Sequence, residues 1–364
     1  MELDAVIQRY QHELATTVFR EPHPEDASRW HQQRIGERTW RVAQPVTLTP
    51  YAAVQPCSAR CRFCSENLRE NGDTGTHASL LRPGMNYFNQ LQTALMALRG
   101  LPLSYSLSGL EMTDHRDWFL RLLDCLSSHA AVSPVEGRVL YSNGAGLTAL
   151  GEDAALAAAI RSFAFDWVEL SRHHPDTVTN QQIMRFRSRE GVMITDQFRE
   201  CVAQLGALTE VKLVCLVQQG GVDSLAALQR YLDWARSLGV RHVILREMSQ
   251  LDQRYRANGT QRYIRASRVS VAGLLQAFLE AHPLAQGTRL RQATHGYYFS
   301  NLVIESDGLT VTFESSNYQR LHEKHDSGQI FKLVFHANGN LCADWNPERH
   351  VLIPAVNGDI THAQ

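Results

Sequence analysis

The chain has 364 residues, and its 36 lysines and arginines nearly balance 37 acidic residues. This length allows one large α/β domain or two ordinary ones, and the charge balance argues against a general nucleic-acid or membrane-surface binder. The N-terminal residues lack the basic segment and apolar run of a signal peptide, and no later apolar run approaches about 18 residues. We therefore expect a soluble, cytoplasmic protein.

The first 43 residues are predicted to form a helical extension. An amphipathic helix is expected over Leu3 to Val18, followed by a polar segment that contains Pro22, Pro24, Trp30 and Trp40. So short a segment buries little surface by itself. We expect it to pack on the main domain rather than form a separate recognition module.

From Val42 onward, short β-rich runs alternate with helical patterns, which predicts repeated βα units and a parallel sheet. Six such units joined by right-handed crossovers would make a partial (β/α)6 TIM-like barrel of the α/β class, with its ligand site at the C-terminal strand ends. Residues 44–285 are assigned to it. The expected strands are Val46–Tyr51, Leu103–Leu107, Arg138–Tyr141, Trp167–Leu170, Val211–Val217 and His242–Leu245. The expected helices are Phe88–Leu98, Trp118–Leu126, Ala154–Phe163, Thr195–Leu205, Leu225–Leu238 and Val271–Ala281.

After Gly287 the pattern changes to strand-like runs separated by turn residues, without clear helices between them. Strands are expected at Tyr297–Ile304, Thr310–Phe313 and Ile330–His336. Residues 286–364 are therefore predicted to form a β-rich cap over the substrate.

Three cysteines, Cys57, Cys61 and Cys64, fall within one short loop after the first barrel strand. Cysteine sulfur is the ligand that iron–sulfur clusters and zinc both take, but structural zinc requires four protein ligands, usually as two pairs. His77 is a nearby fourth candidate for zinc, and three buried core cysteines are disfavoured in so polar a loop. The other four cysteines lie singly, which indicates no disulfide framework and suits a reducing compartment: Cys125, Cys201, Cys215 and Cys342.

The pattern Cys-x3-Cys-x-aromatic-Cys, filled by Cys57, Cys61, Phe63 and Cys64, resembles the signature of the radical S-adenosylmethionine (radical SAM) enzymes. The resemblance implies a [4Fe–4S] cluster held by the three cysteines, with its fourth iron open to SAM. In that family the cluster passes one electron to SAM and cleaves it into methionine and a 5′-deoxyadenosyl radical. An electron donor such as flavodoxin or ferredoxin is implied as well, and the family's partial six-stranded barrel agrees with the predicted βα units.

The resemblance also implies SAM-binding residues at the later strand ends. The segment Ser108-Gly109-Leu110-Glu111 is similar to the family's Gly-Gly-Glu, with Ser108 where glycine is more usual. Gly109 would let the backbone approach the methionyl ammonium, and Glu111 would lie near the same charge. Ser142 and Ser171 match positions whose hydroxyl binds ribose or carboxylate, although each is also typical of a helix cap or turn.

Within the superfamily, the core looks most like the GTP cyclase of molybdenum cofactor biosynthesis. A lysine there meets the SAM carboxylate and a methionine packs on adenine, which points to Lys212 and Met248 here. The resemblance stops at the C-terminus, because that enzyme holds a second cluster through three cysteines and this chain has only Cys342 there. Alternative carboxylate partners that the sequence does not rank are Arg172, Arg185 and Arg187.

Without a second cluster, the substrate must meet side chains of the last section. The candidates are Arg289, Arg291, His295, Tyr297, Tyr298, Asn317, Arg320, His322, His325, Asp344 and Trp345. We expect an enzyme whose radical abstracts hydrogen from a small, polar metabolite in a biosynthetic pathway. Two alternatives stay open: modification of a ribosomally made peptide, and a non-catalytic metal-binding protein that uses the same loop.

Overall fold

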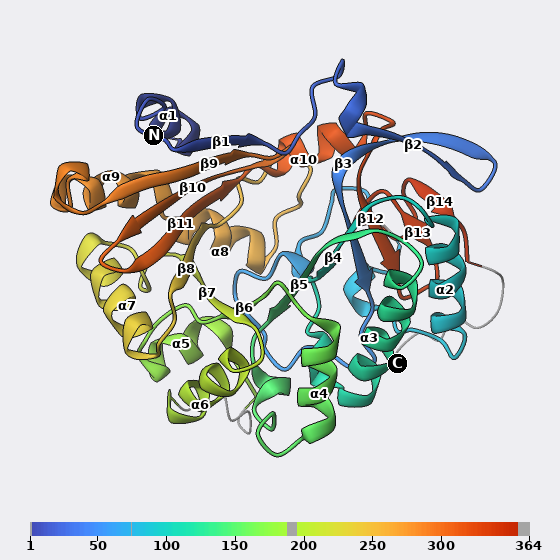
Figure 1. Ribbon diagram of the computed structural model, residues 1–364, viewed down its shortest axis with the longest axis horizontal. Coiled ribbons are helices and arrows are strands. Elements are labelled where there is room, and N and C mark those ends of the chain that lie inside the picture. Colours follow the sequence, from blue (N-terminus) through green and yellow to red (C-terminus); the bar gives the residue numbers. More distant parts are fainter. Residues whose placement is uncertain (1, 74, 188–194, 356–364) are drawn as a thin grey trace.

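A run of eight neighbouring parallel strands forms the centre of the computed structural model, which describes residues 2–73, 75–187 and 195–355 (Figure 1). Six of the strands are neighbours in chain order, and the sheet they form is not closed. The α/β class and the partial barrel are thereby confirmed. The six strands are β3 (Arg38–Tyr51), β4 (Leu103–Leu107), β5 (Val135–Ser142), β6 (Trp167–Ser171), β7 (Glu210–Val217) and β8 (His242–Glu247).

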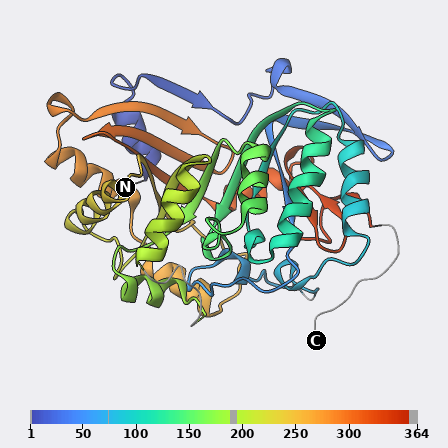
Figure 2. The same ribbon diagram turned by 60° about the horizontal axis from the view of Figure 1, so that its bottom comes forward.

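The helices that connect these strands cover the outer face of the sheet, as Figure 2 shows. Several begin at a side chain that accepts a hydrogen bond from a free backbone N–H group, such as Asp153 at α4 and Ser224 at α7. The helices of this region are α2 (Tyr87–Ala97), α3 (Arg116–Ala130), α4 (Ala154–Phe163), α5 (Thr177–Met184), α6 (Thr195–Gly206), α7 (Leu225–Ser237), α8 (Gly259–Ser267) and α9 (Val271–Ala281).

The two faces of the sheet differ in polarity. Residues of β4 alternate between buried and half-buried, and Leu103, Tyr105 and Leu107 belong to the main apolar core. On the concave face, Arg246 of β8 pairs with Glu169 of β6 and with Glu314. Because β6 and β8 are separated by β7, this network crosses the concave face, which is therefore polar rather than filled by an apolar core.

The C-terminal section extends the sheet at both of its edges. The strand β11 (Leu309–Ser316) pairs in parallel with β8, and β12 (Ile330–His336) pairs in parallel with β3. A helix, α10 (Tyr318–His325), connects these two strands, so the expectation that this section has no helix is wrong. The remaining strands of the section are β9 (Arg289–His295), β10 (Phe299–Ser306), β13 (Leu341–Cys342) and β14 (Val351–Ile353).

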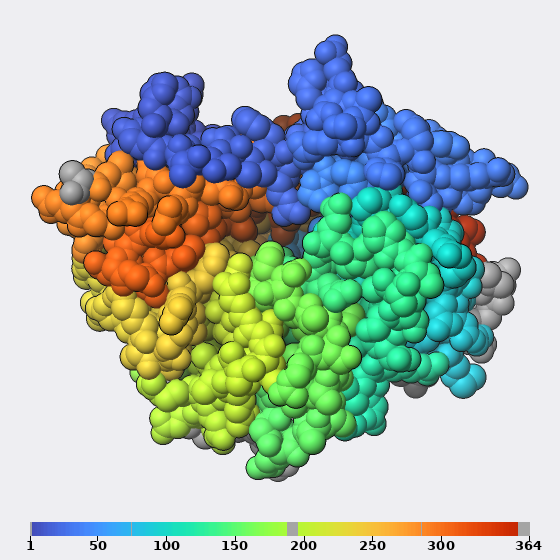
Figure 3. Space-filling view, in the orientation of Figure 1, coloured from blue at the N-terminus to red at the C-terminus, as the bar shows by residue number. Residues whose placement is uncertain are grey.

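The N-terminal segment is mostly extended. The first helix, α1, spans only Leu3–Arg9, and the predicted helix to Val18 is wrong because Thr16–Phe19 forms strand β1, which pairs with β9. Strand β2 (Trp30–Ile35) pairs with the first half of β3. Figure 3 shows this segment, in blue, along one rim of the molecule.

The structure does not test the division into regions 1–43, 44–285 and 286–364, which stays a prediction, although strands from all three join one sheet. In the described part of the chain, every helix is too short or too polar to cross a membrane.

Candidate active site

The cysteine loop begins at the C-terminal end of β3, after Tyr51, and is fastened to its surroundings by backbone groups. The amide of Ser58 donates to Asp114 Oδ2 at 2.6 Å. The amides of Arg60 and Arg62 donate to carbonyl oxygens at the end of α5, at 2.9 and 3.1 Å. These bonds hold the loop against the C-terminal ends of the neighbouring strands, where a parallel barrel places its ligand site.

The three thiols of the loop are half-buried and free. Burial raises the pKa of Cys57 and of Cys64 to about 12, and burial together with the charges of Cys64 and Cys57 raises the pKa of Cys61. Each thiol therefore lies in an environment that disfavours the thiolate unless a cation binds it. Cys57 Sγ also accepts weak hydrogen bonds from the Ala59 amide at 3.4 Å and from Asn143 Nδ2 at 3.5 Å.

These residues fit a [4Fe–4S] cluster, whose irons would supply the missing positive charge and whose ligand sulfurs accept hydrogen bonds from amides. Across residues 2–73, 75–187 and 195–355, no set of three or more His, Cys, Asp or Glu side chains is arranged to hold a single metal ion.

Phe63, between the second and third cysteines, packs beneath the loop. Its ring meets His173 edge-to-face with 4.8 Å between ring centroids. It also packs against the small apolar cluster of Leu68, Met248 and Ile264. The structure thus brings the predicted residues Phe63 and Met248 together beside the loop.

Glu111 and Ser142 also meet, at the ends of β4 and β5. The Ser142 hydroxyl donates to Glu111 Oε1 at 2.9 Å, and the Asn143 amide donates to Glu111 Oε2 at 2.5 Å. The Thr113 hydroxyl adds a third bond at 2.6 Å. Burial, followed by the charge of Asp114, raises the pKa of Glu111 to about 7. The carboxyl group therefore ties two strand ends together directly behind the cysteine loop.

Gly109 has a φ of +91°, a backbone conformation that favours glycine. A Cβ atom at this position would lie 2.5 Å from the Tyr51 ring. The Tyr51 hydroxyl in turn donates to Glu66. Burial raises the pKa of Glu66 to about 7. Tyr51 and Glu66 were missed as site residues, although Glu66 directly follows the cysteine motif.

The structure does not bring the other residues that were predicted to bind SAM into contact with this group. Ser171 is half-buried at the end of β6, in register with Val214. Lys212 is the third residue of β7, and its Nζ lies 3.7 Å from the Trp167 ring centroid and 3.9 Å from Glu210 Oε1. Of the alternative arginines, Arg172 is buried and donates to carbonyl oxygens of its own turn, whereas Arg185 and Arg187 are exposed.

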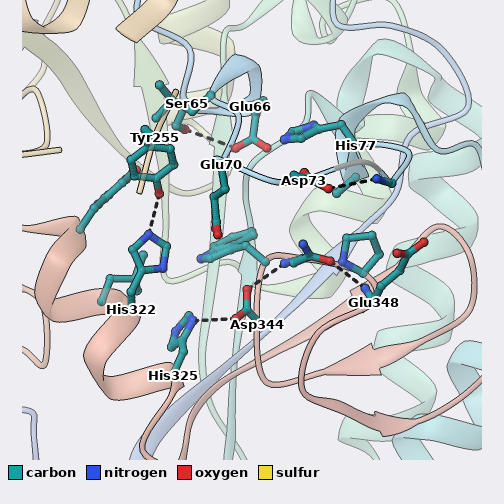
Figure 4. A pocket seen from close by; sticks show the side chains of 18 of the residues that line it. Ser65, Glu66, Glu70, Asp73, His77, Tyr255, His322, His325, Asp344 and Glu348 are labelled. Atoms are coloured by element: carbon teal, nitrogen blue, oxygen red, sulfur yellow. Dashed lines mark hydrogen bonds and ion pairs between the residues drawn. The ribbon is translucent and has the colours of Figure 1, made fainter. Parts of the chain in front are cut away.

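A cavity of about 150 Å³ lies beside the cysteine loop, between residues 65–78, α10 and residues 344–348 (Figure 4). His322 and His325 of α10 point toward it, and His322 Nε2 shares a 2.9 Å hydrogen bond with the Tyr255 hydroxyl. His325 Nδ1 lies 3.8 Å from Asp344 Oδ2. Five predicted substrate residues line this cavity: Tyr298, His322, His325, Asp344 and Trp345.

The remaining substrate candidates have structural partners elsewhere. Arg291 pairs with Glu305 at 2.5 Å on the exposed side of β9 and β10. His295 and Arg320 both lie near Asp4 of α1, at 3.6 and 3.9 Å. Asn317 caps α10, Tyr297 packs on Phe331, and Arg289 pairs in register with Glu305.

Lys332 is a buried residue of the concave face that we did not expect. Its Nζ donates to the hydroxyls of Thr47 and Thr49 at 3.1 and 3.0 Å and lies 4.5 Å from the Trp345 ring centroid. Burial lowers its pKa to about 7. In the sequence, Lys332 is indicated only by its position within the mostly apolar run Ile330–His336.

The sequence matches no known protein-family profile and no curated protein. Its structure is similar to Streptococcus suis SuiB bound to S-adenosylmethionine, with a TM-score of 0.46 and 13% identity over 83% of this chain and 61% of SuiB. It is also similar to anSMEcpe with bound AdoMet, with a TM-score of 0.48 and 14% identity over 82% of this chain and 71% of the other.

A third similar structure is coproporphyrinogen III oxidase from Escherichia coli, described as a radical SAM enzyme, with a TM-score of 0.41 and 10% identity over 72% of this chain and 66% of the other. The chain spans about six tenths of the length of SuiB. At identities this low, the likeness concerns the fold alone.

Proposed function

We propose that this chain is a radical SAM enzyme that cleaves S-adenosylmethionine reductively and uses the resulting radical on a substrate. The observation that carries the proposal is the position of the cysteine motif. Cys57, Cys61 and Cys64 lie half-buried on one loop, at the C-terminal end of the first strand of an unclosed parallel barrel. This is the end at which such folds bind ligands.

The three thiolates would hold a [4Fe–4S] cluster, which when bound supplies the electron that cleaves SAM to methionine and a 5′-deoxyadenosyl radical. The protein's own contribution is to position and shield that site. Asp114 and the end of α5 hold the loop through its backbone amides, and the Asn143 side chain donates to Cys57 Sγ.

We further propose that SAM is bound by the predicted residues at the strand ends. The Glu111 and Ser142 pair lies behind the loop, the Tyr51 ring packs closely on the backbone of Gly109, and Met248 shares an apolar cluster with Phe63. These positions support a polar slot for the methionyl and ribose groups and an apolar slot for adenine. The last members of the proposed set are Ser171 and Lys212, with Lys212 carried over from the molybdenum-cofactor cyclase branch.

The substrate is proposed to be a small, polar metabolite. The cavity beside the loop is lined by side chains that can donate, accept or exchange protons, among them Tyr255, His322 and Asp344. Its volume of about 150 Å³ suits a small group rather than a large apolar ligand. The cytoplasmic location and a biosynthetic role are parts of this proposal that rest on the sequence.

Anaerobic incubation of the reconstituted protein with dithionite and SAM tests the proposal. We expect 5′-deoxyadenosine and methionine, detected by liquid chromatography and mass spectrometry. Cys57→Ala, Cys61→Ala and Cys64→Ala should each abolish the product, whereas Cys125→Ala, a buried cysteine of α3, should not. A protein that binds SAM and never cleaves it would contradict the proposal.

Metal analysis of anaerobically purified protein distinguishes the non-catalytic alternative. About four irons with matching sulfide per chain support the enzyme, whereas about one zinc without sulfide supports a metal-binding protein. The peptide-modifying alternative predicts stable binding of a short peptide encoded beside the enzyme. If no such peptide binds and a metabolite stimulates the formation of 5′-deoxyadenosine, these results would support the small-molecule substrate.

A further inference from the structure

The cavity beside the cysteine loop is strongly acidic. Among the described residues that line it there is no lysine or arginine. The Arg349 guanidinium, which does not line the cavity, pairs with Glu70 at 2.8 Å and lies 4.0 Å from Asp344 Oδ2. No other lysine or arginine nitrogen of residues 2–73, 75–187 and 195–355 lies within 4.0 Å of a lining carboxylate. The lining carboxylates are Glu66, Glu70, Asp73, Asp344 and Glu348.

Two of the lining histidines do not compensate this negative charge. Burial lowers the pKa of His77 to about 4, and burial followed by the charge of Arg254 lowers the pKa of His322. Both imidazoles are therefore mainly neutral at pH 7. The cavity keeps an excess of negative charge, which attracts cations and repels anions.

Three buried polar atoms of the cavity have no hydrogen-bond partner in the described part of the chain: Asp344 Oδ2, His322 Nδ1 and His325 Nε2. Asp344 and His325 are each 3% exposed, and His322 is 5% exposed. Figure 4 shows the three side chains gathered together. Buried polar atoms are nearly always paired, so these three indicate a polar ligand.

The Asp344 carboxylate is the most demanding of the three groups. Burial alone would raise its pKa, but His325, the Asn346 amide and Arg349 lower the pKa to about 2, so the group is ionised. The nitrogens nearest to Oδ2 are 3.8 Å away in His325 and His350, too far for a hydrogen bond. An ammonium group offers three N–H donors to such an oxygen and to a neutral imidazole nitrogen beside it.

Aromatic rings form a further part of the lining. The ring centroid of Tyr318 lies 6.1 Å from that of Tyr255 and 6.5 Å from that of Tyr298, and Trp345 also lines the cavity. The faces of such rings attract cations within about 6 Å. Carboxylates and aromatic rings around one small cavity together favour a cationic ligand.

We propose that this cavity binds a small aliphatic amine in its protonated form as the substrate, an inference that rests on the proposed radical SAM function. The ammonium group donates to Asp344 Oδ2 and to an imidazole nitrogen of α10, while the rings cover its alkyl chain. A carboxylate or phosphate group would meet like charges instead, because the nearest guanidinium is already paired with Glu70.

Three ligands of equal chain length test the charge preference: cadaverine, glutarate and 1,5-pentanediol. Their dissociation constants are measured by saturation-transfer-difference NMR on cluster-loaded protein with SAM and without reductant, so that binding is observed without turnover. We expect cadaverine to bind at least about tenfold more tightly than the other two. Added salt should weaken this binding only partly, because buried charges are screened less than exposed ones.

Asp344→Asn should weaken cadaverine binding about tenfold or more, because the charged acceptor is lost. Glu348→Gln changes an exposed lining residue that the fold does not need, and it should weaken binding about two- to threefold. Thermal unfolding shows whether each variant is folded. The matched control is Glu280→Gln, an exposed glutamate of α9 outside the lining, which should bind cadaverine as the unmodified protein does.

The outcomes separate this inference from the proposed function. No detectable binding of cadaverine, equal or tighter binding of glutarate or 1,5-pentanediol, or unchanged binding in every folded cavity variant would overturn the amine site. Tighter binding of Nα-acetyl-lysine N-methylamide than of cadaverine, lost in the cavity variants, would assign the cavity to a peptide lysine and overturn the free amine. Failure to cleave SAM with dithionite, with cadaverine still bound, would overturn the radical SAM function but not the amine site.

Discussion

At the scale of single residues, Lys332 is the clearest departure from an ordinary interior. An ammonium buried without a carboxylate loses hydration that two threonine hydroxyls only partly replace. Such a group is expected where it serves a site, because burial that lowers a lysine pKa to about 7 also lets the amine gain and lose a proton near neutrality. Its neighbour Trp345 lines the cavity beside the cysteine loop.

The lowered pKa of Lys332 predicts how stability depends on pH. Between about pH 7 and pH 10 the unfolded chain would keep this proton while the folded protein loses it, so the free energy of unfolding should rise with pH in this window. Below about pH 7 Lys332 is protonated in both the folded and the unfolded state, so it no longer makes the free energy of unfolding depend on pH. In Lys332→Met the rise should be smaller, by up to about 1.4 kcal/mol per pH unit. Urea unfolding at pH 7, 8 and 9 measures this, and parallel pH dependence in both proteins would contradict it.

Gly109 and Gly100 form a matched pair for testing the close contact between Gly109 and the Tyr51 ring. Both have positive φ, at +91° and +86°, but a Cβ atom would clash with Tyr51 only at Gly109. Gly100→Ala should therefore cost about 1 kcal/mol of stability from backbone strain alone. Gly109→Ala should cost more and should also weaken SAM binding at least tenfold, because Tyr51 must move. Equal effects of the two variants on SAM binding, measured by equilibrium dialysis, would remove Gly109 from the site.

At the scale of elements, the six βα units could be predicted because short strands such as Leu103–Leu107, with alternating apolar and polar residues, are followed by capped amphipathic helices. The helix α10 could not, because its residues Tyr318–His325 are almost all polar and it packs largely through Leu321, His322 and His325. In the N-terminal segment, Leu3, Val6 and Ile7 gave the helical pattern, which ends at Arg9. The following Thr16–Phe19 is extended because β9 offers it a strand edge, a partner that lies far away in sequence.

The residues of the candidate site also fall into two groups, those that the sequence could predict and those that it could not. The cysteine loop and the residues that directly follow strand ends, such as Glu111 and Ser142, could be found because chain order places them at one end of a parallel barrel. Tyr255 and Lys332 could not be found in this way. Their positions depend on which strands and loops from the last third of the chain meet the cysteine loop. The lysine within the run Ile330–His336 indicates a buried amine, but it does not indicate what that amine contacts.

The helix α5 is expected to stabilise the cluster through the loop that it holds. Asp176 caps α5 by accepting hydrogen bonds from the Thr179 amide and hydroxyl, both at 2.8 Å. Asp176→Ala should lower the free energy of unfolding by about 1 kcal/mol and should fray α5, the helix whose C-terminal carbonyl groups hold the cysteine loop. The reconstituted cluster should then lose its visible absorption faster in the presence of a chelator. Ser224→Ala removes the cap of α7 at a similar cost, and it should leave the rate of cluster loss unchanged.

At the scale of the whole molecule, the last section completes the sheet rather than merely covering it. Strand β11 takes up the free edge of β8, and β12 takes up the free edge of β3. Both barrel edges would otherwise present unpaired backbone N–H and C=O groups, which invite pairing between molecules. The same two strands contribute Glu314 and Lys332 to the concave face, so edge protection and site construction depend on the same segment.

A truncated chain tests this dependence. A protein ending at residue 287 would keep the six predicted βα units but lose β9 to β14 and α10. We expect it to aggregate, because two parallel strands gain open edges and Arg246 loses its partner Glu314. The control ends at residue 355 and keeps every described strand, so it should be monodisperse by size-exclusion chromatography with light scattering and should unfold like the full chain. A soluble, cooperatively folded protein of residues 1–287 would show instead that the six-unit barrel is stable alone, and that β11 and β12 serve the site rather than the fold.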